Sequence, residues 1–543
     1  MKVLSFLFSG SLKQVILSGI ISMLAASFYI LAIQAFGEVL QYVQGDFPLA
    51  FLKMVGLVLG STLTAILGSH YITNHFEFKI SGTRIKLSEL VLKSSFDRIE
   101  KKKNIIIPTL YNDIITLGTF AKSLPDFIVS FFTVITIWGY MFFISWEFTL
   151  IFIGVFMVAM LIVLVSQSYL YQQEKRAVGE RNILYRRMNG LVDGLKELTL
   201  NLAHKKVYAK ELIGTASDKF AKYNVNRNKV LIAVSKVSES FILISLGVII
   251  IIAAYFETGS ELLYDFFTLI PFTLPSLIRI GLFFSNLKKA EVALEQVESL
   301  DVLLHEFKDD KIKKGNENTQ FNISGDNGPI ISLRDVHYEY LRKGGESAFE
   351  VGPYNLDINQ GEALLINGGN GSGKTTLIKL LTGLYIPSRG EIECMGTKID
   401  YSNLAVYRDI FSAVFADSYV FQDLRYIQHE RVDELKERYL DVLEIRNKVS
   451  LDDGIQLSTT DLSMGQMSRL NLFRSMLEDK DLYVFDEWAA NQDPYFKGKF
   501  YNEIIPQLKK EGKTLIIISH DEHYFHVADR RVTVSQGSLL SSN

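Results

Sequence analysis

The stretch GGNGSGKT at residues 368–375 decides the fold of the second half of this chain. It fills the pattern Gly-x-x-x-x-Gly-Lys-Ser/Thr and directly follows an apolar, strand-like run at 363–366. A glycine-rich turn lets successive backbone N–H groups converge on phosphate oxygens at the positive end of the following helix. A glycine-rich loop without a ligand would be the alternative, but an apolar helical run at 377–384 completes a strand–loop–helix unit. The stretch therefore predicts a nucleoside triphosphate site.

The side chains of this loop have separate expected roles. Lys374 is expected to contact the β- and γ-phosphates, and Thr375 is expected to ligate Mg²⁺. The residues expected to bind the nucleotide in this region are Gly368, Gly369, Asn370, Gly371, Ser372, Gly373, Lys374, Thr375 and Thr376.

The first 300 residues have a different character, because the apolar residues of the chain concentrate there. Of the 543 residues, 48% are hydrophobic, which is high for a soluble protein. A helix needs about 20 residues to cross a hydrocarbon core. Six stretches of suitable length predict six spans, at 14–36, 50–70, 126–145, 148–168, 239–256 and 264–287.

The charges between these stretches predict an orientation in a lipid bilayer. The connections after the first, third and fifth stretches contain acidic residues, such as Glu38 and Glu147, but no lysine or arginine. The long segments after the second and fourth stretches are basic, with a lysine triplet at 101–103 and an arginine pair at 186–187. By the positive-inside rule, the basic segments and both termini are expected in the cytoplasm.

The overall charge and the cysteine count argue against several other classes. The formal net charge is -3 and the basic clusters flank the expected spans, so we expect no nucleic-acid partner. Cys394 is the only cysteine, which leaves no disulfide framework and no cysteine-based metal site.

A polar segment divides the chain between roughly residues 305 and 330. After it, β-rich runs at 330–333, 363–366, 482–485 and 514–518 alternate with helical patterns, which predicts an α/β fold around the P-loop. The expected domains are an α-helical transmembrane domain with long cytoplasmic extensions at 1–304, a linker at 305–328, and a nucleotide-binding domain at 329–543.

Two adjacent carboxylates, Asp486 and Glu487, follow the apolar run at 482–485. The carboxyl ends of such strands are where open α/β sheets bind ligands. Asp486 is expected to hold Mg²⁺ through water, and Glu487 to polarise the water that attacks the γ-phosphate. An acidic strand cap would be the plainer reading of the pair alone, but its combination with the phosphate loop favours catalysis.

The segment 462–466, Leu-Ser-Met-Gly-Gln, resembles the LSGGQ signature of ATP-binding cassette (ABC) proteins. That resemblance implies that Ser463, Gly465 and Gln466 belong to the site of an ATP held by the opposing subunit. A hydroxyl and a bare backbone at a helix N-terminus suit a phosphate. Ser463 would also be unremarkable as a plain helix cap.

Three further positions extend this resemblance. Tyr340 matches the aromatic residue that stacks on adenine, His520 matches the switch histidine at the γ-phosphate, and Asp493 matches the aspartate of the loop linking two ATP sites. Six spans followed by one cassette is the layout of an ABC exporter half-transporter, whose ATPase drives transport across the membrane. Because each ATP site of that family uses the phosphate loop of one cassette and the signature of the other, the resemblance implies a homodimer.

One position departs from the ABC pattern. ABC cassettes usually carry a glutamine before the signature, but the aligned stretch here reads Val-Phe-Ala-Asp-Ser at 414–418, with Ala416 in that place. Our hypothesis is that Asp417 replaces the glutamine as a water or Mg²⁺ contact. The alternative is that Asp417 only caps a turn.

The sequence variants within the cassette resemble one branch of the family. The strings DEWAANQDP at 486–494 and SHDEHYF at 519–525, together with VFAD at 414–417, look like exporters of cyclic peptides and peptide siderophores, such as pyoverdine-precursor and lasso-peptide exporters. This resemblance implies a bacterial cytoplasmic (inner) membrane protein with a peptide-like cargo. An importer built on the same fold, or an ATPase that gates a channel, remains open.

The sixth expected span contains Arg279, after Pro271 and Pro275. An arginine at membrane depth costs about 2.5 kcal/mol or more unless it faces protein or water. Arg279 is therefore expected to line the cargo pathway and favour an anionic group, or else to snorkel toward the cytoplasmic interface. The prolines are expected to interrupt the helix. Segments 109–119 and 188–198 are the expected contacts to the cassettes.

Overall fold

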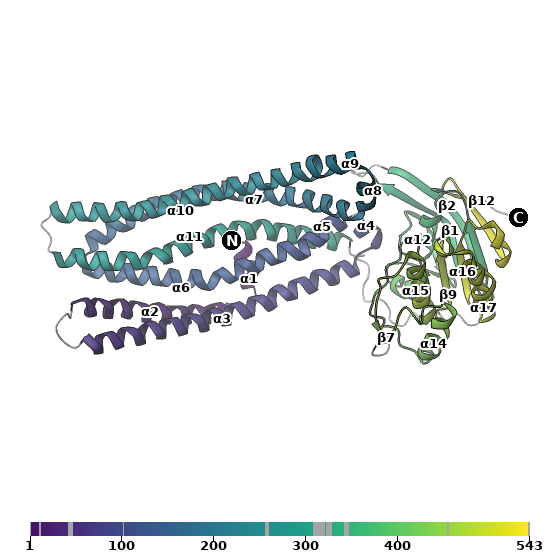
Figure 1. The fold of residues 1–543 in the computed structure, drawn as a ribbon, viewed down its shortest axis with the longest axis horizontal. Helices are drawn as coiled ribbons and strands as arrows, with labels where there is room; N and C mark the ends of the chain where they lie inside the picture. The colour runs from purple at the N-terminus through teal and green to yellow at the C-terminus, as the bar shows by residue number, and fades with distance from the viewer. Residues whose placement is uncertain are drawn as a thin grey trace. The chain divides into compact units, whose positions relative to one another are not determined.

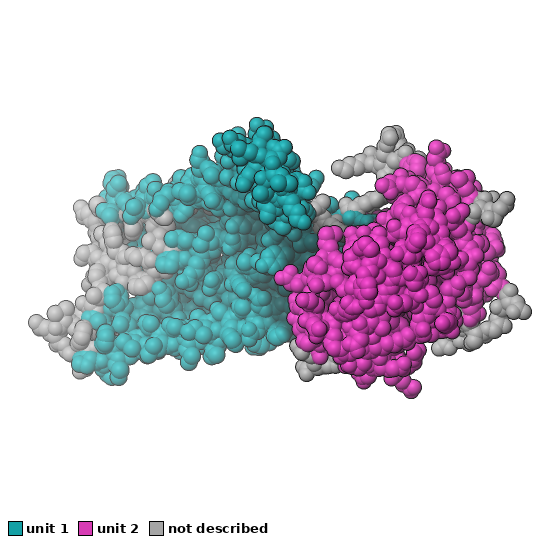
Figure 2. Space-filling model, turned by 45° about the vertical axis from the view of Figure 1, so that its right-hand side comes forward, with its two compact units in different colours: residues 1–94, 99–306 teal, residues 95–98, 307–543 magenta. Residues whose placement is uncertain are grey.

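The computed structural model describes residues 2–9, 12–41, 47–100, 102–255, 260–307, 321, 328–341, 347–452 and 456–540. The chain divides into two compact units (Figure 2). The first comprises Met1–Ser94 and Ile99–Glu306, and the second comprises Ser95–Arg98 and Phe307–Asn543. Most of the expected linker at 305–328 lies outside the described residues.

The first unit is entirely helical where it is described (Figure 1). Its elements, with α4 shared between the two units, are α1 (Lys2–Phe8), α2 (Leu12–Gln41), α3 (Phe47–Lys93), α4 (Phe96–Glu100), α5 (Lys103–Pro108), η1 (Thr109–Asp113), α6 (Ile114–Ile144), α7 (Trp146–Asp193), α8 (Leu195–Leu200), α9 (Leu202–Val207), η2 (Tyr208–Gly214), α10 (Thr215–Tyr255) and α11 (Ser260–Phe307). Helices α3, α7, α10 and α11 are 47, 48, 41 and 48 residues long. They are about twice the length that crosses a bilayer, so each must extend beyond it.

The long helices pack in pairs. Helix α2 lies along α3, α7 lies along α10, and α6 contacts α2, α3 and α7 (Figure 1). Large apolar side chains such as Leu63 and Leu161 remain exposed on α3 and α7. Water would penalise this surface, whereas a hydrocarbon environment favours it.

Four helices are long and apolar enough to cross a membrane in the part of the chain that is described. They are Ile16–Gly37, Pro48–Lys93, Ile105–Ile144 and Trp146–Asp193, and they contain the first four expected spans apart from residues 14 and 15 of the first and residue 145 of the third. The fifth and sixth expected spans, 239–256 and 264–287, fall on α10 and α11, where several side chains lie outside the described set. The expected total of six membrane spans stays a prediction.

The expected interruption of the last span is wrong. Helix α11 runs continuously from Ser260 to Phe307, through Pro271 and Pro275. A proline removes one backbone hydrogen bond, but a long helix packed against neighbours can tolerate that loss.

The second unit contains two main sheets and a small hairpin (Figure 1). The larger sheet has the order β12-β11-β3-β10-β9-β6, and the smaller sheet has the order β2-β1-β4-β5. The strands are β1 (Pro329–Leu341), β2 (Ser347–Asn359), β3 (Ala363–Asn367), β4 (Arg389–Cys394), β5 (Thr397–Lys398), β6 (Phe411–Val414), β7 (Leu451–Asp452), β8 (Gln456–Leu457), β9 (Leu482–Asp486), β10 (Thr514–Ile518), β11 (Arg530–Ser535) and β12 (Ser538–Leu540).

Helices cover this α/β unit. They are α12 (Lys374–Leu381), α13 (Leu404–Asp409), α14 (Val432–Val442), α15 (Met464–Leu477), η3 (Trp488–Asn491), α16 (Pro494–Lys499), η4 (Phe500–Ile504), α17 (Ile505–Lys510) and η5 (Glu522–Val527). All four strand-like runs singled out in the sequence are strands, namely parts of β1, β3, β9 and β10.

The centre of the larger sheet explains why the site forms where it does. Strands β3, β10 and β9 are parallel neighbours, with Ile366 opposite Ile518 and Ile518 opposite Asp486. Strands β9 and β10 are fully buried and read as continuous apolar runs, as expected for a parallel sheet covered on both faces. Because the three strands end at the same edge, the loops that follow them meet there.

Candidate ATP site

The phosphate loop connects β3 to α12 through backbone conformations that favour glycine. Gly368, Gly371 and Gly373 have φ values of 150°, 74° and 108°. A Cβ at residue 368 would lie 2.2 Å from the Val534 carbonyl oxygen, which no side chain could tolerate. A Cβ at residue 371 would meet nothing within 4 Å, so this part of the loop faces open space. The loop is thus closed on its inner side and open where a phosphate would lie.

Lys374 begins α12 and is held inside the loop. Its side chain is only 6% exposed, and Nζ donates hydrogen bonds to the carbonyl oxygens of Gly368 at 2.8 Å and Gly369 at 3.1 Å. The same Nζ lies 3.9 Å from Oε1 of Glu487. An ammonium group this close to the loop carbonyls supplies a positive charge where the loop N–H groups also point.

The two carboxylates after β9 have different environments. Asp486 is 5% exposed, and burial, together with the nearby charges of Glu487 and Asp417, raises its pKa to about 6. The positive charges of Lys374 and Lys379 oppose this rise. Glu487 is more exposed and has a φ of 51°, a left-handed conformation that turns the chain sharply after the strand.

His520 follows β10 and contacts Glu487 directly. Its Nε2 lies 3.0 Å from Oε1 of Glu487, within hydrogen-bonding distance. The preceding residue, Ser519, fixes the turn, because its Oγ accepts from the N–H of Asp521 at 3.1 Å and pairs with the hydroxyl of Tyr501 at 2.7 Å. The fold therefore brings Lys374, Glu487 and His520 together from three loops at one sheet edge.

A cavity beside the loop has the lining that ATP requires. It has a volume of about 360 Å³ and is bounded by Tyr340, Phe349, Val351 and loop residues 371–376. The hydroxyl of Tyr340 lies 2.7 Å from Oγ1 of Thr376, which fixes the ring at the edge of the cavity. The hydroxyl of Ser372 is buried without a hydrogen-bond partner. An orphaned hydroxyl and an open glycine turn fit a triphosphate, and an aromatic wall fits adenine.

The acidic residues fit a divalent cation less directly. Among the described residues there is no group of three or more His, Cys, Asp or Glu side chains that forms a ready-made metal site. Burial raises the pKa of Asp486 most, and the repulsion from Glu487 and Asp417 that adds to this rise is what a cation would relieve. Thr375 is exposed at the start of α12, where its hydroxyl is accessible.

The signature segment forms the N-terminus of α15. The Oγ of Ser463 accepts from the N–H of Gln466 at 3.4 Å, and Oε1 of Gln466 accepts from the N–H of Ser463 at 3.1 Å. This reciprocal pair is a capping box, so Gln466 has a structural role in forming the helix end. The carbonyl of Gly465 accepts from Nε2 of Gln492 at 3.0 Å.

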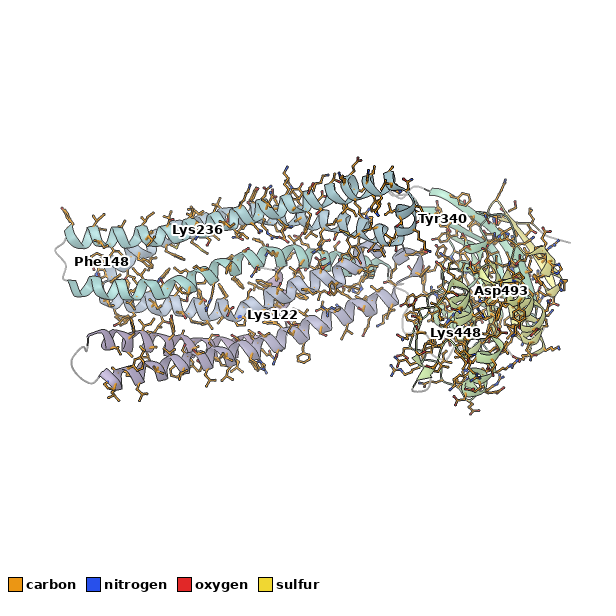
Figure 3. The ribbon with its side chains drawn as sticks, viewed as in Figure 1. Lys122, Phe148, Lys236, Tyr340, Lys448 and Asp493 are labelled. Atoms are coloured by element: carbon orange, nitrogen blue, oxygen red, sulfur yellow. The ribbon has the colours of Figure 1, made fainter. Side chains whose placement is uncertain are left out.

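The loop after the acidic pair is tied to the signature helix. Trp488 donates from Nε1 to the carbonyl of Ser468 at 2.7 Å, and Gln492 bonds to Gly465. Asp493 caps α16, since its Oδ1 accepts from the N–H of Phe496 at 3.0 Å. Figure 3 shows Tyr340 and Asp493 among the side chains of the second unit. Sequence reasoning missed the link from Trp488 and Gln492 to α15, because nothing local indicates it.

The residues around Ala416 form an exposed turn after β6. The turn is capped by Ser418, whose Oγ accepts from the N–H of Phe415 at 2.7 Å. Ala416 and Asp417 are both exposed. Ser418 therefore caps the turn, and the expected role of Asp417 as a water or Mg²⁺ contact stays a prediction.

A second group missed from the sequence surrounds Lys379 on α12. Its Nζ lies 4.9 Å from the ring centre of Tyr385 and 5.5 Å from that of Phe96, which belongs to the short segment of the second unit. Tyr385 stacks on Tyr338 at 4.6 Å, and Tyr338 packs against Tyr340 at 5.0 Å. The segments 109–119 and 188–198 belong to the first unit, and their expected contact with the cassettes stays a prediction.

Arg279 lines a separate cavity inside the first unit. This cavity has a volume of about 630 Å³ and includes Tyr29 of α2, His70 of α3 and Thr133 of α6. Tyr29 lies well inside the first apolar helix.

These features define a P-loop ATPase joined to a helical membrane domain. Residues 351–490 match the family model described as ABC transporter. The chain is similar to ATP-binding protein SyrD of Pseudomonas syringae pv. syringae, with 29% identity over 84% of this chain and 82% of that protein. It is also similar to the L-cystine import ATP-binding protein TcyC of Bacillus subtilis, with 30% identity over 34% of this chain and 80% of that protein.

A solved structure shares the whole fold. The structure of a bacterial Atm1-family ABC exporter with ATP bound matches with a TM-score of 0.72 at 15% identity, covering 98% of this chain and 95% of that one. The chain belongs to the ABC transporter family and is an ABC exporter half-transporter, in which ATP hydrolysis is coupled to transport. It is a membrane protein with a cytoplasmic ATPase domain.

Proposed function

We propose that this chain exports a cyclic or otherwise modified peptide, of the peptide siderophore or lasso/microcin type, across the bacterial cytoplasmic (inner) membrane. The observation that carries the export part is the assembly of Lys374, Glu487 and His520 at one sheet edge of an exporter fold. The proposal of a peptide cargo rests on the cassette segments at 414–417, 486–494 and 519–525. Residues 1–304 form the transmembrane domain, 305–328 the linker and 329–543 the cassette.

The working unit is a homodimer. Within one chain, Ser463 is hydrogen-bonded to Gln466 and Gly465 to Gln492. Ser463 is nevertheless exposed at the start of α15. One chain supplies one phosphate loop and one signature, so two copies make two equivalent sites. Asp493, which caps α16, lies on the loop that would run between the two sites.

The residues of the ATP site have distinct roles. Lys374 moves from the loop carbonyls to the β- and γ-phosphates, while the loop N–H groups hold the other phosphate oxygens. Tyr340 stacks on adenine. Glu487 accepts a hydrogen bond from the attacking water and orients it, and His520 holds the Glu487 carboxylate and reaches the γ-phosphate.

Mg²⁺ would be held by Thr375 and Asp486, with Asp417 as a further contact through water. Bound there, the ion neutralises charge on the transferred phosphoryl group. The carboxylate of Asp486, with a pKa raised by burial and by its acidic neighbours, gains most from such a cation.

Transport follows by alternating access between two states of the dimer. ATP binding closes the cassettes and turns the cargo cavity outward, and hydrolysis resets them. Arg279 lines the cargo pathway. An importer is the second candidate, because a cassette similar to this one belongs to a protein named for L-cystine import.

The test uses inside-out membrane vesicles, whose cassettes face the outer medium, with ATP and a labelled peptide siderophore or lasso peptide added outside. Accumulation with the wild type but not with Glu487→Gln supports export driven by this site. Robust ATPase activity without accumulation would contradict the peptide cargo or the direction. Uptake into right-side-out vesicles would favour the importer.

A further inference from the structure

A cavity with several polar groups in its lining lies among apolar helices of the first unit. It is lined by α2, α3, α6 and α11, and its lining combines one arginine, one tyrosine, one histidine and a set of hydroxyl groups. Its volume of about 630 Å³ is within the range of about 300–1,000 Å³ that binds compact organic ligands. It can therefore hold one end or one loop of a peptide rather than a large folded molecule.

Arg279 carries the positive charge of this cavity. Its side chain is exposed to the cavity, and no acidic side chain of the described residues forms an ion pair with it. Tyr29, which lines the same cavity, lies within the apolar helix Ile16–Gly37. At that depth an arginine costs about 2.5–3.5 kcal/mol in an insertion scale, which an anionic ligand would offset.

Three hydroxyl groups of the lining have already used their protons. Ser61 donates to the carbonyl of Ala25, Thr62 to that of Val58 and Thr133 to that of Val129, each at 2.9 Å. A hydroxyl has one proton and two lone pairs, so each of these oxygens can only accept a further bond from the cavity. Acceptors of this kind pair with N–H groups and repel carboxylates.

We propose that this cavity binds the carboxylate of a peptide at Arg279 and the peptide N–H groups at the oxygens of Ser61, Thr62 and Thr133. The different ligand groups assigned to Arg279 and to the hydroxyl oxygens follow from the chemistry of these side chains. A guanidinium offers donors only, and the three hydroxyls offer acceptors only. The cavity thus selects a peptide with a free carboxylate next to amide N–H groups. This inference rests on the proposed export of a peptide.

His70 completes the lining on α3. Its Nε2 lies 3.1 Å from Nδ2 of Asn74, within hydrogen-bonding distance. Among the described lining residues, Arg279 is the only lysine or arginine of the cavity.

The experiment compares two forms of one probe on the full-length protein in lipid nanodiscs. The probe is a short, N-terminally labelled peptide of uncharged residues with either a C-terminal carboxylate or a C-terminal carboxamide. Binding is followed by fluorescence anisotropy. The wild type is expected to bind the carboxylate form at least about tenfold more tightly. In Arg279→Gln this ratio is expected to fall to about one, and Arg279→Lys should restore part of it.

Two further variants separate charge recognition from general damage. Arg186→Gln removes an exposed arginine of α7 that is not part of the cavity, and should keep the wild-type ratio. Thr62→Val removes one acceptor at almost constant shape, and should weaken both forms about equally. Melting temperature and size-exclusion profile verify that each variant is folded.

The outcomes are distinct. A wild type that binds both forms equally, or an Arg279→Gln variant that keeps the preference, overturns the inference while peptide export itself still stands. If neither form binds and the vesicles accumulate no peptide, the proposed cargo fails and the inference fails with it.

Discussion

Replacing Asp486 with asparagine should stabilise the ligand-free cassette at neutral pH. The carboxylate is 5% exposed, and burial beside Glu487 and Asp417 raises its pKa from the ordinary 3.8 to about 6. At about 1.36 kcal/mol per pKa unit, this rise corresponds to about 3 kcal/mol of destabilisation of the charged form. The asparagine amide would be buried without hydrogen-bond partners, which costs about 1–2 kcal/mol. We therefore expect the substitution to increase the free energy of unfolding by about 1–2 kcal/mol.

The sign of the pH dependence follows from the raised pKa. Because the folded protein holds this proton more tightly than the unfolded chain, the contribution of Asp486 to stability is complete below about pH 4. It is lost as the pH rises through about 6. The advantage of Asp486→Asn over the wild type should therefore be larger at about pH 7 than at about pH 5.

The assay is thermal unfolding of the full-length protein with a chelator present, followed by tryptophan fluorescence. The sequence has three tryptophans, and replacing Trp138 and Trp146 with phenylalanine leaves Trp488, two residues from Asp486, as the reporter. A gain of about 1–2 kcal/mol raises the midpoint by roughly 2–8 °C for a unit of this size. Asp409→Asn, at an aspartate whose side chain is 78% exposed, is the control. A variant no more stable than the wild type at about pH 7 would refute the reasoning.

Three further outcomes are expected. Glu487→Gln should lower ATP hydrolysis by about 10²–10⁴-fold while nucleotide binding persists, measured by steady-state ATPase assay and by binding of a fluorescent ATP analogue; a smaller loss would mean that another group orients the water. Asp417→Ala should raise the Mg²⁺ concentration needed for half-maximal ATPase activity, and an unchanged Mg²⁺ requirement would remove Asp417 from the site. Lys379→Met removes the charge between the rings of Phe96 and Tyr385, a contact of about 0.5–2 kcal/mol. The amount of cargo transported per ATP hydrolysed should fall, and an unchanged amount would show that this contact does not couple ATP hydrolysis to transport.

The phosphate loop was predictable because its information is local. Glycines at 368, 371 and 373 have the positive φ values that such a loop needs, and Lys374 opens the helix as expected. The acidic pair was equally predictable, since Asp486 and Glu487 directly follow a continuous apolar run that could only be a buried strand. In each case neighbours in sequence dictate the backbone.

The continuity of α11 shows the limit of such reasoning. Pro271 and Pro275 suggested a break, but the helix passes through both. Local propensity favoured interruption, and packing against neighbouring helices decided otherwise. The contacts of Trp488 and Gln492 with α15 were missed for a similar reason, because each joins residues separated by 20 or 27 positions.

The sequence by itself determined the chemistry of this protein: a phosphate loop, an acidic pair, a signature and a run of apolar helices. Residues close together in the sequence specify each of these features. Only the tertiary structure decided how these pieces meet. The parallel order of β3, β10 and β9 places Lys374, Glu487 and His520 in contact, and four helices surround Arg279 with hydroxyl oxygens. Such contacts depend on packing between segments far apart in the chain, which short-range propensities do not specify.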